Sequence, residues 1–219
     1  MKHAQELFDF LAILQENNHK DWMDANRTWY KKVRDIHIAW LTTVNDKLAE
    51  VDPNYYDTPG KKGINRINNN LLFHPNLPVY KDHFGAGFDK APNSGDFYLE
   101  LGVNSSMMAG GFYRPHSNIL KRIRAAIDYD GEVFKAIIEA PKFKAFFKGL
   151  ITDDILKNSP KGYAADHPHI ELLKYKTFAV RHELNQEDIF ASSFDDYVVE
   201  VYEAMLPFRN YLNTAVTVE

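Results

Sequence analysis

The feature that most limits the fold is a strictly alternating segment near the middle of the chain, DFYLELGV, which begins at Asp96. Apolar side chains occupy every second position from Phe97 to Val103, and the positions between them include Tyr98 and Glu100. A period of two is typical of a strand with one buried face, because successive side chains point to opposite faces. A short turn leads into a second extended run, SMMAGGFYRP. The two runs together predict an antiparallel hairpin.

Helical periods precede this hairpin. One helix is predicted from Leu7 to Leu14, before a pair of asparagines. A longer pattern repeats every three to four residues from Trp22 to Leu48 and ends at Asp52, which is followed by a proline. We expect one continuous helix over this second pattern.

Helical periods also follow the hairpin. Pro115 is expected to open a helix at its first position, where a missing N–H costs nothing, and Asp130 is expected to end it. The run KTFAVRHEL predicts one more strand, and a final helix is predicted from Ser193, with Asp196 completing an approximate capping box. Helices gathered at both ends around an antiparallel sheet predict an α+β fold, with long helices at the N- and C-terminal ends. No linker or repeat divides the sequence, so we expect a single domain over residues 1–219.

The composition argues against several classes of function. The chain has no cysteine, which excludes disulfides, thiolate zinc sites and a cysteine nucleophile. Its net charge of −4 argues against a general nucleic-acid binder, which needs many Lys and Arg side chains. No window approaches the roughly 18 apolar residues of a membrane span, and Glu6 and Asp9 interrupt the apolar start. We expect a cytoplasmic protein that binds neither nucleic acid nor membrane, and the oligomeric state stays open.

No motif supports a standard catalytic centre or a cofactor. The GAGF stretch lacks the third glycine of a dinucleotide fingerprint, and catalytic-serine and zinc-protease signatures do not occur. The densest group of metal-ligand types is Asp166, His167 and His169. A carboxylate before His-Pro also fits a helix N-cap, and we favour this interpretation of Asp166. We therefore predict no cofactor and no stoichiometric transition metal. Three further histidines could converge from elsewhere in the chain: His74, His83 and His116.

The segment GGFYRPH is a candidate anion site. Its glycines expose backbone N–H groups beside Tyr113 and Arg114, at a predicted helix start. A helix amino terminus with a neighbouring arginine attracts anions. The alternative is a solvated Arg114 and a Tyr113 packed in the core, and the residues alone leave both open.

Several short stretches, taken in order, resemble one family. They are LFDFLAILQENNHKDWMDANRTWY, the central RIN with its later YK, GGFYRP, RIRAAI, PKGY, DHP and LLKYKTF. This ordered set is similar to the domain of unknown function 2461 family of bacterial and fungal proteins, over nearly the whole chain. The resemblance implies one intact domain of a family without an established activity, and it supplies no catalytic roles.

The resemblance also implies a central segment dense in paired charges, of the form R-I-x-R-D-x-R-F-S-x-D-K-x-P-Y-K. The matching stretch here is RINNNLLFHPNLPVYK. Five positions match: Arg66, Ile67, Phe73, Tyr80 and Lys81. Five positions where the family has charged residues are neutral here: Asn69, Asn70, Leu72, Asn76 and Leu77. We interpret the stretch as a family site from which much of the charge has been removed.

The asparagine run within this stretch is expected to be more than a loop. Ile64, Ile67 and Leu71 flank it and should draw it towards the core. We therefore expect Asn69 and Asn70 on a pocket wall, with at least one side-chain amide buried and hydrogen-bonded.

These observations lead to three hypotheses about function. The first is a small-ligand-binding domain with a pocket for an anionic group, formed where the central segment, GGFYRPH and PKGYAADHP share one concave surface. The second is an enzyme in which His116 or His167 acts as acid, base or metal ligand, close to Asp166. The third is a noncatalytic protein–protein interaction module with an aromatic-rich surface. The candidate ligand-binding residues are Arg66, Asn69, Asn70, Tyr80, Lys81, Tyr113, Arg114, His116, Lys161, Asp166 and His167.

Overall fold

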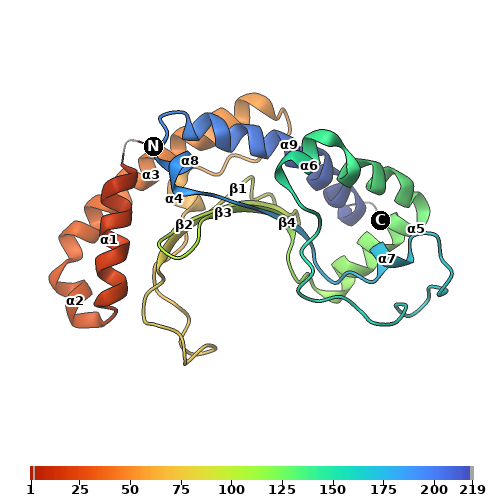
Figure 1. Cartoon of the computed structure of the whole chain (residues 1–219), viewed down its shortest axis with the longest axis horizontal. Helices are drawn as coiled ribbons and strands as arrows, with labels where there is room; N and C mark the ends of the chain where they lie inside the picture. The colour runs from red at the N-terminus through yellow and green to blue at the C-terminus, as the bar shows by residue number, and fades with distance from the viewer. Residues whose placement is uncertain (2, 218–219) are drawn as a thin grey trace. The chain divides into compact units, whose positions relative to one another are not determined.

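The computed structural model describes Met1 and residues 3–217, and it confirms the α+β class (Figure 1). A four-stranded antiparallel sheet and long helices near both ends of the chain make up the fold. The strands are β1 (His83–Phe88), β2 (Asp96–Gly102), β3 (Met107–Phe112) and β4 (Phe178–Glu183). The helices are α1 (Ala4–Glu16), α2 (Lys20–Ala25), α3 (Arg27–Val51), α4 (Gly60–Gly63), α5 (Ser117–Glu139), α6 (Pro141–Phe146), α7 (Ile170–Leu173), α8 (Gln186–Phe190) and α9 (Phe194–Thr217).

The sheet has the strand order β1-β2-β3-β4. The predicted hairpin is confirmed as β2 and β3, and the predicted later strand is confirmed as β4. In β2 the side chains of Phe97, Leu99 and Leu101 are buried, whereas those of Tyr98 and Glu100 are half-buried. The period of two therefore separates a core face from a more polar face, as the sequence predicts.

β1 is a strand that the sequence patterns do not predict. Glycine is depleted in strands, and two of the six residues in β1 are Gly85 and Gly87. A side chain at position 85 would collide with Tyr98, whose ring carbon Cζ would lie 3.0 Å from the added Cβ. The glycine therefore leaves room for the Tyr98 side chain across β1, and this requirement is tertiary rather than local.

The long helical pattern before the sheet is divided into α2 and α3. Asn26 leaves helical geometry between them, with φ −104° and ψ 16°. Its side-chain Nδ2 donates to the carbonyl oxygen of Trp22 at 2.9 Å. The prediction of one continuous helix was wrong, because the asparagine amide competes with the backbone for a helical carbonyl. The predicted end of the pattern is confirmed, since α3 stops at Val51.

The predicted boundaries of the helix after the hairpin also differ from the structure. α5 begins at Ser117 with His116 at its N-cap, so Pro115 precedes the helix and does not open it. The expected end at Asp130 coincides with a break inside α5, where φ −146° and ψ 44° are not helical, and the helix then resumes to Glu139. α9 begins at Phe194, directly after the expected Ser193.

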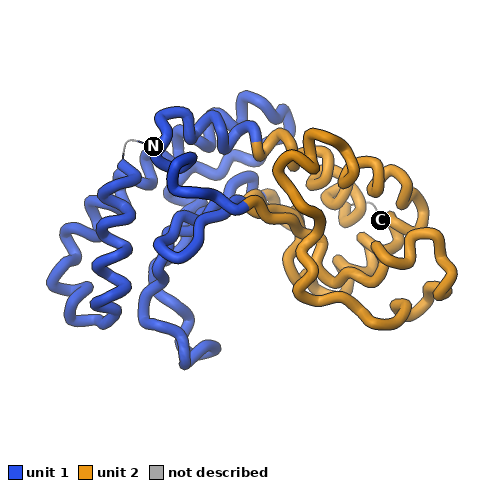
Figure 2. The backbone as a smooth tube through the Cα atoms, viewed as in Figure 1, with its two compact units in different colours: residues 1–90, 98–108, 183–200 blue, residues 91–97, 109–182, 201–219 orange. Residues whose placement is uncertain are grey.

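Residue contacts divide the described chain into two compact units (Figure 2). Unit 1 comprises residues 1–90, 98–108 and 183–200, and unit 2 comprises residues 91–97, 109–182 and 201–219. In unit 1, α3 contacts α1, α2 and α4, and Phe10 meets Trp29 edge to face at 5.1 Å. In unit 2, α5 contacts α6 and α7, and Phe134 packs 5.8 Å from Phe208. The expectation of a single domain stays a prediction.

None of the helices in the described part of the chain is both long enough and apolar enough to cross a membrane. The expected cytoplasmic location stays a prediction.

Candidate functional site

In unit 1 the central segment pairs with β1 and the residues before it. Antiparallel bridges join Ile64 to Ala86 and Asn68 to Tyr80. These bridges are four residues apart along the first segment and six residues apart along the second. The second segment therefore bulges between them. The backbone N–H of Lys81 donates to the carbonyl of Ile67 at 2.8 Å, so Lys81 lies directly before the bulge.

Helix α4 holds the start of this segment against α3. A Cβ added at Gly60 would lie 2.8 Å from Cβ of Leu41, and nearer still to the backbone carbonyl of Ile38. The backbone N–H of Gly60 donates to Oγ1 of Thr42 at 3.2 Å. Only glycine allows this approach, so the segment leaves α3 from a fixed point.

Two cationic residues meet at the bulge. Nζ of Lys81 donates to the backbone carbonyl oxygen of Arg66 at 2.8 Å. Burial lowers the pKa of the Lys81 ammonium, the charge of Arg66 lowers it further, and Glu100 acts in the opposite sense. Arg66 is exposed. Among the residues that the structure describes, neither cation forms a salt bridge with a carboxylate, and Glu100 acts on Lys81 without a direct ion pair.

A chain of polar side chains continues from Lys81 across β1 and β2. The Tyr98 hydroxyl donates to Oε2 of Glu100 at 2.9 Å, and the same oxygen lies 3.4 Å from Nε2 of His83. Nδ1 of His83 lies 2.9 Å from Oδ1 of Asp82. The imidazole of His83 therefore stands between two carboxylates.

The protonation states in this chain follow from burial and hydrogen bonding. Burial raises the pKa of the Tyr98 hydroxyl, and the charge of Glu100 and the hydrogen bond to it raise it further. Burial opposes ionisation of Asp82, but hydrogen bonds from His83 and Asn104 outweigh it and lower the pKa of this carboxyl. Tyr98 is accordingly a proton donor and Asp82 an ionised acceptor at neutral pH. An imidazole between two carboxylates is chemically suited to move a proton.

The other predicted residues of the central segment have structural contacts of their own. Nδ2 of Asn69 donates to the carbonyl of Pro78 at 2.9 Å, whereas Asn70 is exposed. Tyr80 is only 3% exposed, and the Asn18 amide bonds both its N–H (2.8 Å) and its carbonyl (2.9 Å). The Tyr80 ring therefore belongs to the core. The expectation of a buried amide was wrong, because Asn69 is only half-buried, its bond to Pro78 is exposed, and Asn70 is exposed. A pocket wall formed by Asn69 and Asn70 stays a prediction.

In unit 2 the predicted residues around the end of β3 are exposed. Arg114 has a positive φ of 46°, and its backbone N–H donates to Oγ1 of Thr177 at 3.2 Å. Its guanidinium carbon lies 5.3 Å from the ring centroid of Tyr113. Tyr113 is 54% exposed, so the alternative in which it packs in the core was wrong. His116 is the N-cap residue of α5 without a side-chain cap bond.

The loop before α7 carries Lys161, Asp166 and His167. Lys161 and Asp166 are exposed. The N-cap of α7 is His169, so the predicted cap at Asp166 was wrong. The N–H of His169 donates to Nδ1 of His167 at 3.0 Å, which makes the contact that was expected from the carboxylate. Nε2 of His167 lies 2.9 Å from Oδ1 of Asp128 on α5.

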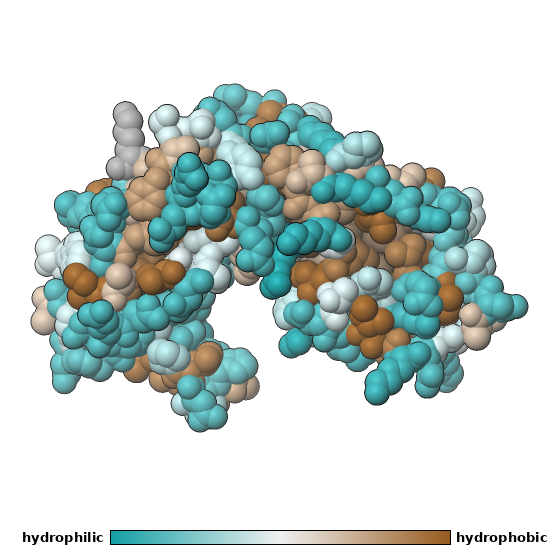
Figure 3. All heavy atoms as spheres, in the orientation of Figure 1, coloured by the Kyte–Doolittle hydropathy of each residue, from teal (hydrophilic) through white to brown (hydrophobic). Residues whose placement is uncertain are grey.

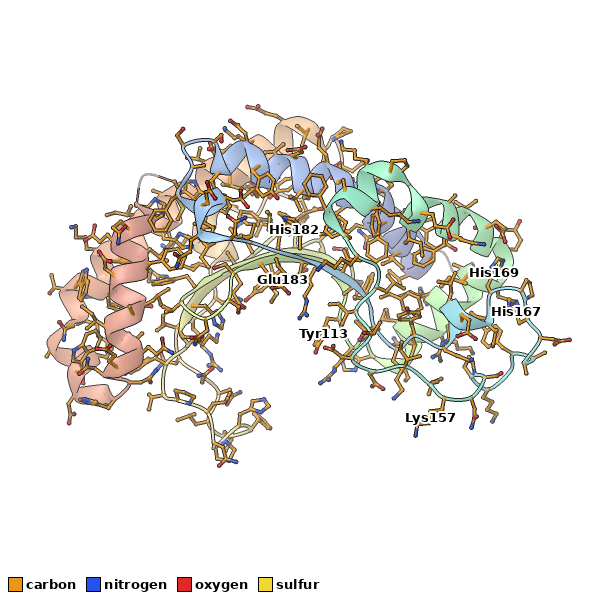
Figure 4. All side chains as sticks on the ribbon, in the orientation of Figure 1. Tyr113, Lys157, His167, His169, His182 and Glu183 are labelled. Atoms are coloured by element: carbon orange, nitrogen blue, oxygen red, sulfur yellow. The ribbon has the colours of Figure 1, made fainter. Side chains whose placement is uncertain are left out.

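The predicted site residues thus fall into separate groups. Arg66 and Lys81 belong to unit 1, and the loop before α7 belongs to unit 2. Within unit 2, Tyr113 lies at the end of β3, apart from His167 and His169 beside α7 (Figure 4). The concave surface shared by all three segments stays a prediction.

Metal binding has no direct support in the part of the chain that is described. Over Met1 and residues 3–217, no group of three or more His, Asp or Glu side chains is placed to hold a metal ion. The absence of a stoichiometric transition metal stays a prediction, which elemental analysis can test.

The polar chain on β1 and β2 is absent from the predicted site. The sequence did contain part of the signal, because the alternation of DFYLELGV puts Tyr98 and Glu100 on one face. His83 entered only as one of several distant histidines, since β1 itself is not predicted. The adjacency of β1 and β2 is what brings His83 to Glu100.

Comparison with known proteins gives one match. A family model described as conserved hypothetical protein, DUF2461, matches residues 6–211. No curated protein and no solved structure matches the chain. The matched range includes the Arg66–Lys81 pair and the polar chain beside it.

Proposed function

The chain belongs to the DUF2461 family, and we propose that it binds a small molecule through an anionic group held by Arg66 and Lys81. The observation that carries this proposal is the contact between Nζ of Lys81 and the backbone carbonyl of Arg66, beside which the charge of Arg66 lowers the pKa of Lys81. Two neighbouring cations repel each other, and burial of one adds to the cost. An anion between them would offset both effects.

The side chains of Arg66 and Lys81 would contribute differently to anion binding. The exposed guanidinium of Arg66 has a planar set of donors that matches a carboxylate or a phosphate with two parallel hydrogen bonds. The half-buried ammonium of Lys81 is a compact charge fixed by its bond to the Arg66 carbonyl. Burial and the charge of Arg66 lower the pKa of Lys81 without a ligand, so a bound anion should raise it.

An acid–base enzyme is the second candidate function, and the position of His83 between Asp82 and Glu100 favours it. A ligand anchored at Lys81 would lie two residues along the chain from this imidazole. The Tyr98 hydroxyl, which is protonated and hydrogen-bonded to Glu100, would act as a proton donor. This hypothesis replaces His116 and His167 by His83 as the acid–base residue.

The protein–protein interaction hypothesis draws support from another part of unit 1. The loop between α4 and β1 exposes Leu72 (85%), Phe73 (72%) and Leu77 (47%) to solvent. Figure 3 shows hydrophobic side chains at the tip of this loop. No partner is identified by these side chains alone, so the anion site remains the primary proposal.

Thermal melts with inorganic phosphate and citrate, at constant ionic strength, test the anion site. Tryptophan fluorescence reports on unit 1, because Trp22, Trp29 and Trp40 all lie there. A bound anion at 100 times its Kd should stabilise unit 1 by about 2.7 kcal/mol and raise the melting midpoint. Lys81→Met and Arg66→Gln should abolish the rise.

The exposed Lys62→Gln variant on α4 is the matched control, because it removes one nearby positive charge outside the pair. This variant should keep the full rise in melting midpoint with phosphate and with citrate. The proposal is wrong if neither anion raises the midpoint, or if Lys62→Gln loses as much of the rise as Lys81→Met. For the acid–base hypothesis, the NMR signals of the His83 ring nitrogens should shift when phosphate is added at constant pH, and unchanged signals would count against it.

A further inference from the structure

Unit 2 contains a pocket between α5 and α9 that is separate from the proposed anion site in unit 1. Its volume is about 760 Å³, within the range of pockets that hold small organic molecules. Most of the lining is apolar or small, and it includes Ala126, Tyr129, Ile137 and Pro207. Tyr129 is 92% exposed, so a large aromatic ring is available to a molecule that enters.

Two polar atoms at the pocket have no partner. Oδ1 of Asp130 and the hydroxyl of Tyr211 are buried, and neither forms a hydrogen bond within the described residues. Both residues line the pocket, Asp130 from α5 and Tyr211 from α9. Buried polar groups in proteins are nearly always hydrogen-bonded, so an unpaired acceptor and an unpaired hydroxyl in one pocket require an explanation.

The backbone places Asp130 at a special point of α5. Its φ of −146° and ψ of 44° interrupt the helix, which resumes and runs to Glu139. On the opposite wall the Tyr211 ring is fixed by Phe134, whose centroid lies 4.9 Å away. Burial raises the pKa of the Tyr211 hydroxyl, and the charge of Asp130 raises it further. The hydroxyl is therefore protonated and the carboxylate is the negative group of the pocket.

The positive charge that lines the pocket lies away from Asp130. Arg122 is eight residues earlier on α5, about 12 Å along the helix axis at 1.5 Å per residue. Its side chain is exposed, and NH1 donates to the carbonyl of Val216 near the end of α9 at 2.6 Å. No salt bridge neutralises Asp130 within the described residues. The carboxylate end of the pocket is thus free to receive a cation.

We propose that this pocket binds an organic amine, with the protonated nitrogen at Asp130 and Tyr211 and an apolar body along Ala126, Ile137 and Pro207. An ammonium group supplies donors for the unpaired carboxylate oxygen and for the oxygen of the Tyr211 hydroxyl. A charge-assisted hydrogen bond is stronger than a neutral one. The exposed ring of Tyr129 can cover the apolar body or face the cation.

A matched set of three probes tests the chemistry: 4-phenylbutylamine, 4-phenylbutanol and 5-phenylpentanoate. They share one apolar body and differ in the charge of one end. Calorimetric titrations of the whole protein at pH 7 should rank the amine first, the alcohol second and the acid last. The amine should bind about tenfold or more tighter than the alcohol, as expected for a charged hydrogen bond.

Variants then assign the effect to the pocket. Asp130→Asn should remove the preference for the amine and leave the alcohol within about twofold, since the apolar contacts remain. Glu139→Gln removes an exposed carboxylate from the same helix and should change neither affinity. Tyr211→Phe should weaken the amine more than the alcohol.

Three results would overturn the proposal: the acid binding as tightly as the amine, the amine binding Asp130→Asn as well as the natural chain, or no binding of any probe. If Asp130→Asn fails to fold, the ranking of the probes on the natural chain and on Tyr211→Phe decides the question. The phosphate melts on unit 1 are an independent measurement, so failure of one proposal leaves the other in place.

Discussion

Replacing His37 by glutamine should flatten the pH dependence of the stability of unit 1. His37 lies on α3 and is 1% exposed. Its Nδ1 lies 3.2 Å from Nε2 of His3, and its ring packs 5.5 Å from the rings of Trp40 and Phe84. Burial lowers the pKa of the His37 imidazole to about 3, and the charge of His3 acts in the same direction. The folded protein therefore keeps this ring neutral.

The sign and size of the effect follow from linkage. The imidazole has a pKa of about 6.5 in the unfolded state. Below that pH the unfolded state binds a proton that the folded state does not bind. Stability must then fall as the pH drops from 6.5 towards 3. A pH of 5 lies about 1.5 units below the unfolded pKa, and each unit corresponds to about 1.36 kcal/mol. Protonation of the His37 imidazole in the unfolded state therefore lowers the free energy of unfolding by about 2 kcal/mol at pH 5.

Urea melts at pH 7.5 and pH 5.0, followed by tryptophan fluorescence, measure this loss. The free energy of unfolding of the natural chain should fall by about 2 kcal/mol more between these pH values than that of His37→Gln. Glutamine keeps a polar group beside His3 but cannot titrate, so the absolute stability can change while the slope loses the His37 contribution.

The exposed His74→Gln variant is the control and should keep the full slope of the natural chain. His3 contributes to the slope in every variant, because burial lowers the pKa of its imidazole to about 4. Equal slopes for the natural chain and His37→Gln would refute the buried neutral ring as the origin of the acid sensitivity.

Three further predictions concern packing, the asparagine run and metal content. Gly60→Ala should lower the free energy of unfolding by about 1–3 kcal/mol in urea melts, because the new Cβ would collide with the backbone of Ile38; an unchanged midpoint would contradict this. Asn69→Ala should cost about 0.5–1.5 kcal/mol through its lost bond to Pro78, whereas the exposed Asn70→Ala should stay within about 0.5 kcal/mol; equal melting midpoints would show that the bond contributes nothing. Elemental analysis should find far less than one equivalent of transition metal, and one equivalent that disappears in His167→Ala would reverse this expectation.

The elements that the sequence predicts best are those in which local period and tertiary environment agree. The alternation from Phe97 to Val103 predicts β2, because its apolar positions are also its buried ones. The prediction of helix boundaries fails where a single side chain interrupts the helix that the apolar period predicts. Asn26 divides a helical pattern at the point where its side-chain amide and its own backbone N–H share the Trp22 carbonyl, and apolar periodicity carries no information about such a bond.

The candidate site was only partly predictable for a related reason. Arg66 and Lys81 were named from the resemblance, and the structure brings them into contact. The polar chain beside them needs β1 next to β2, and β1 has glycines where a strand pattern would show side chains. From the local sequence alone, Gly85 is compatible with a loop. The structure explains the glycine by the Tyr98 side chain, which occupies the space that a Cβ at position 85 would need.

The neutral positions of the central segment can now be placed relative to the charges that remain. Three of the five, Leu72, Asn76 and Leu77, lie on the exposed loop between the asparagine run and Pro78. The retained Arg66 and Lys81 lie outside that loop, on the two paired segments that close its base. Loss of charge therefore changes what the loop tip presents to solvent and leaves the cation pair intact. If the proposed anion site is correct, the pair would hold the anion, and the loop rather than the pair is where this chain should differ from the family pattern in what it binds.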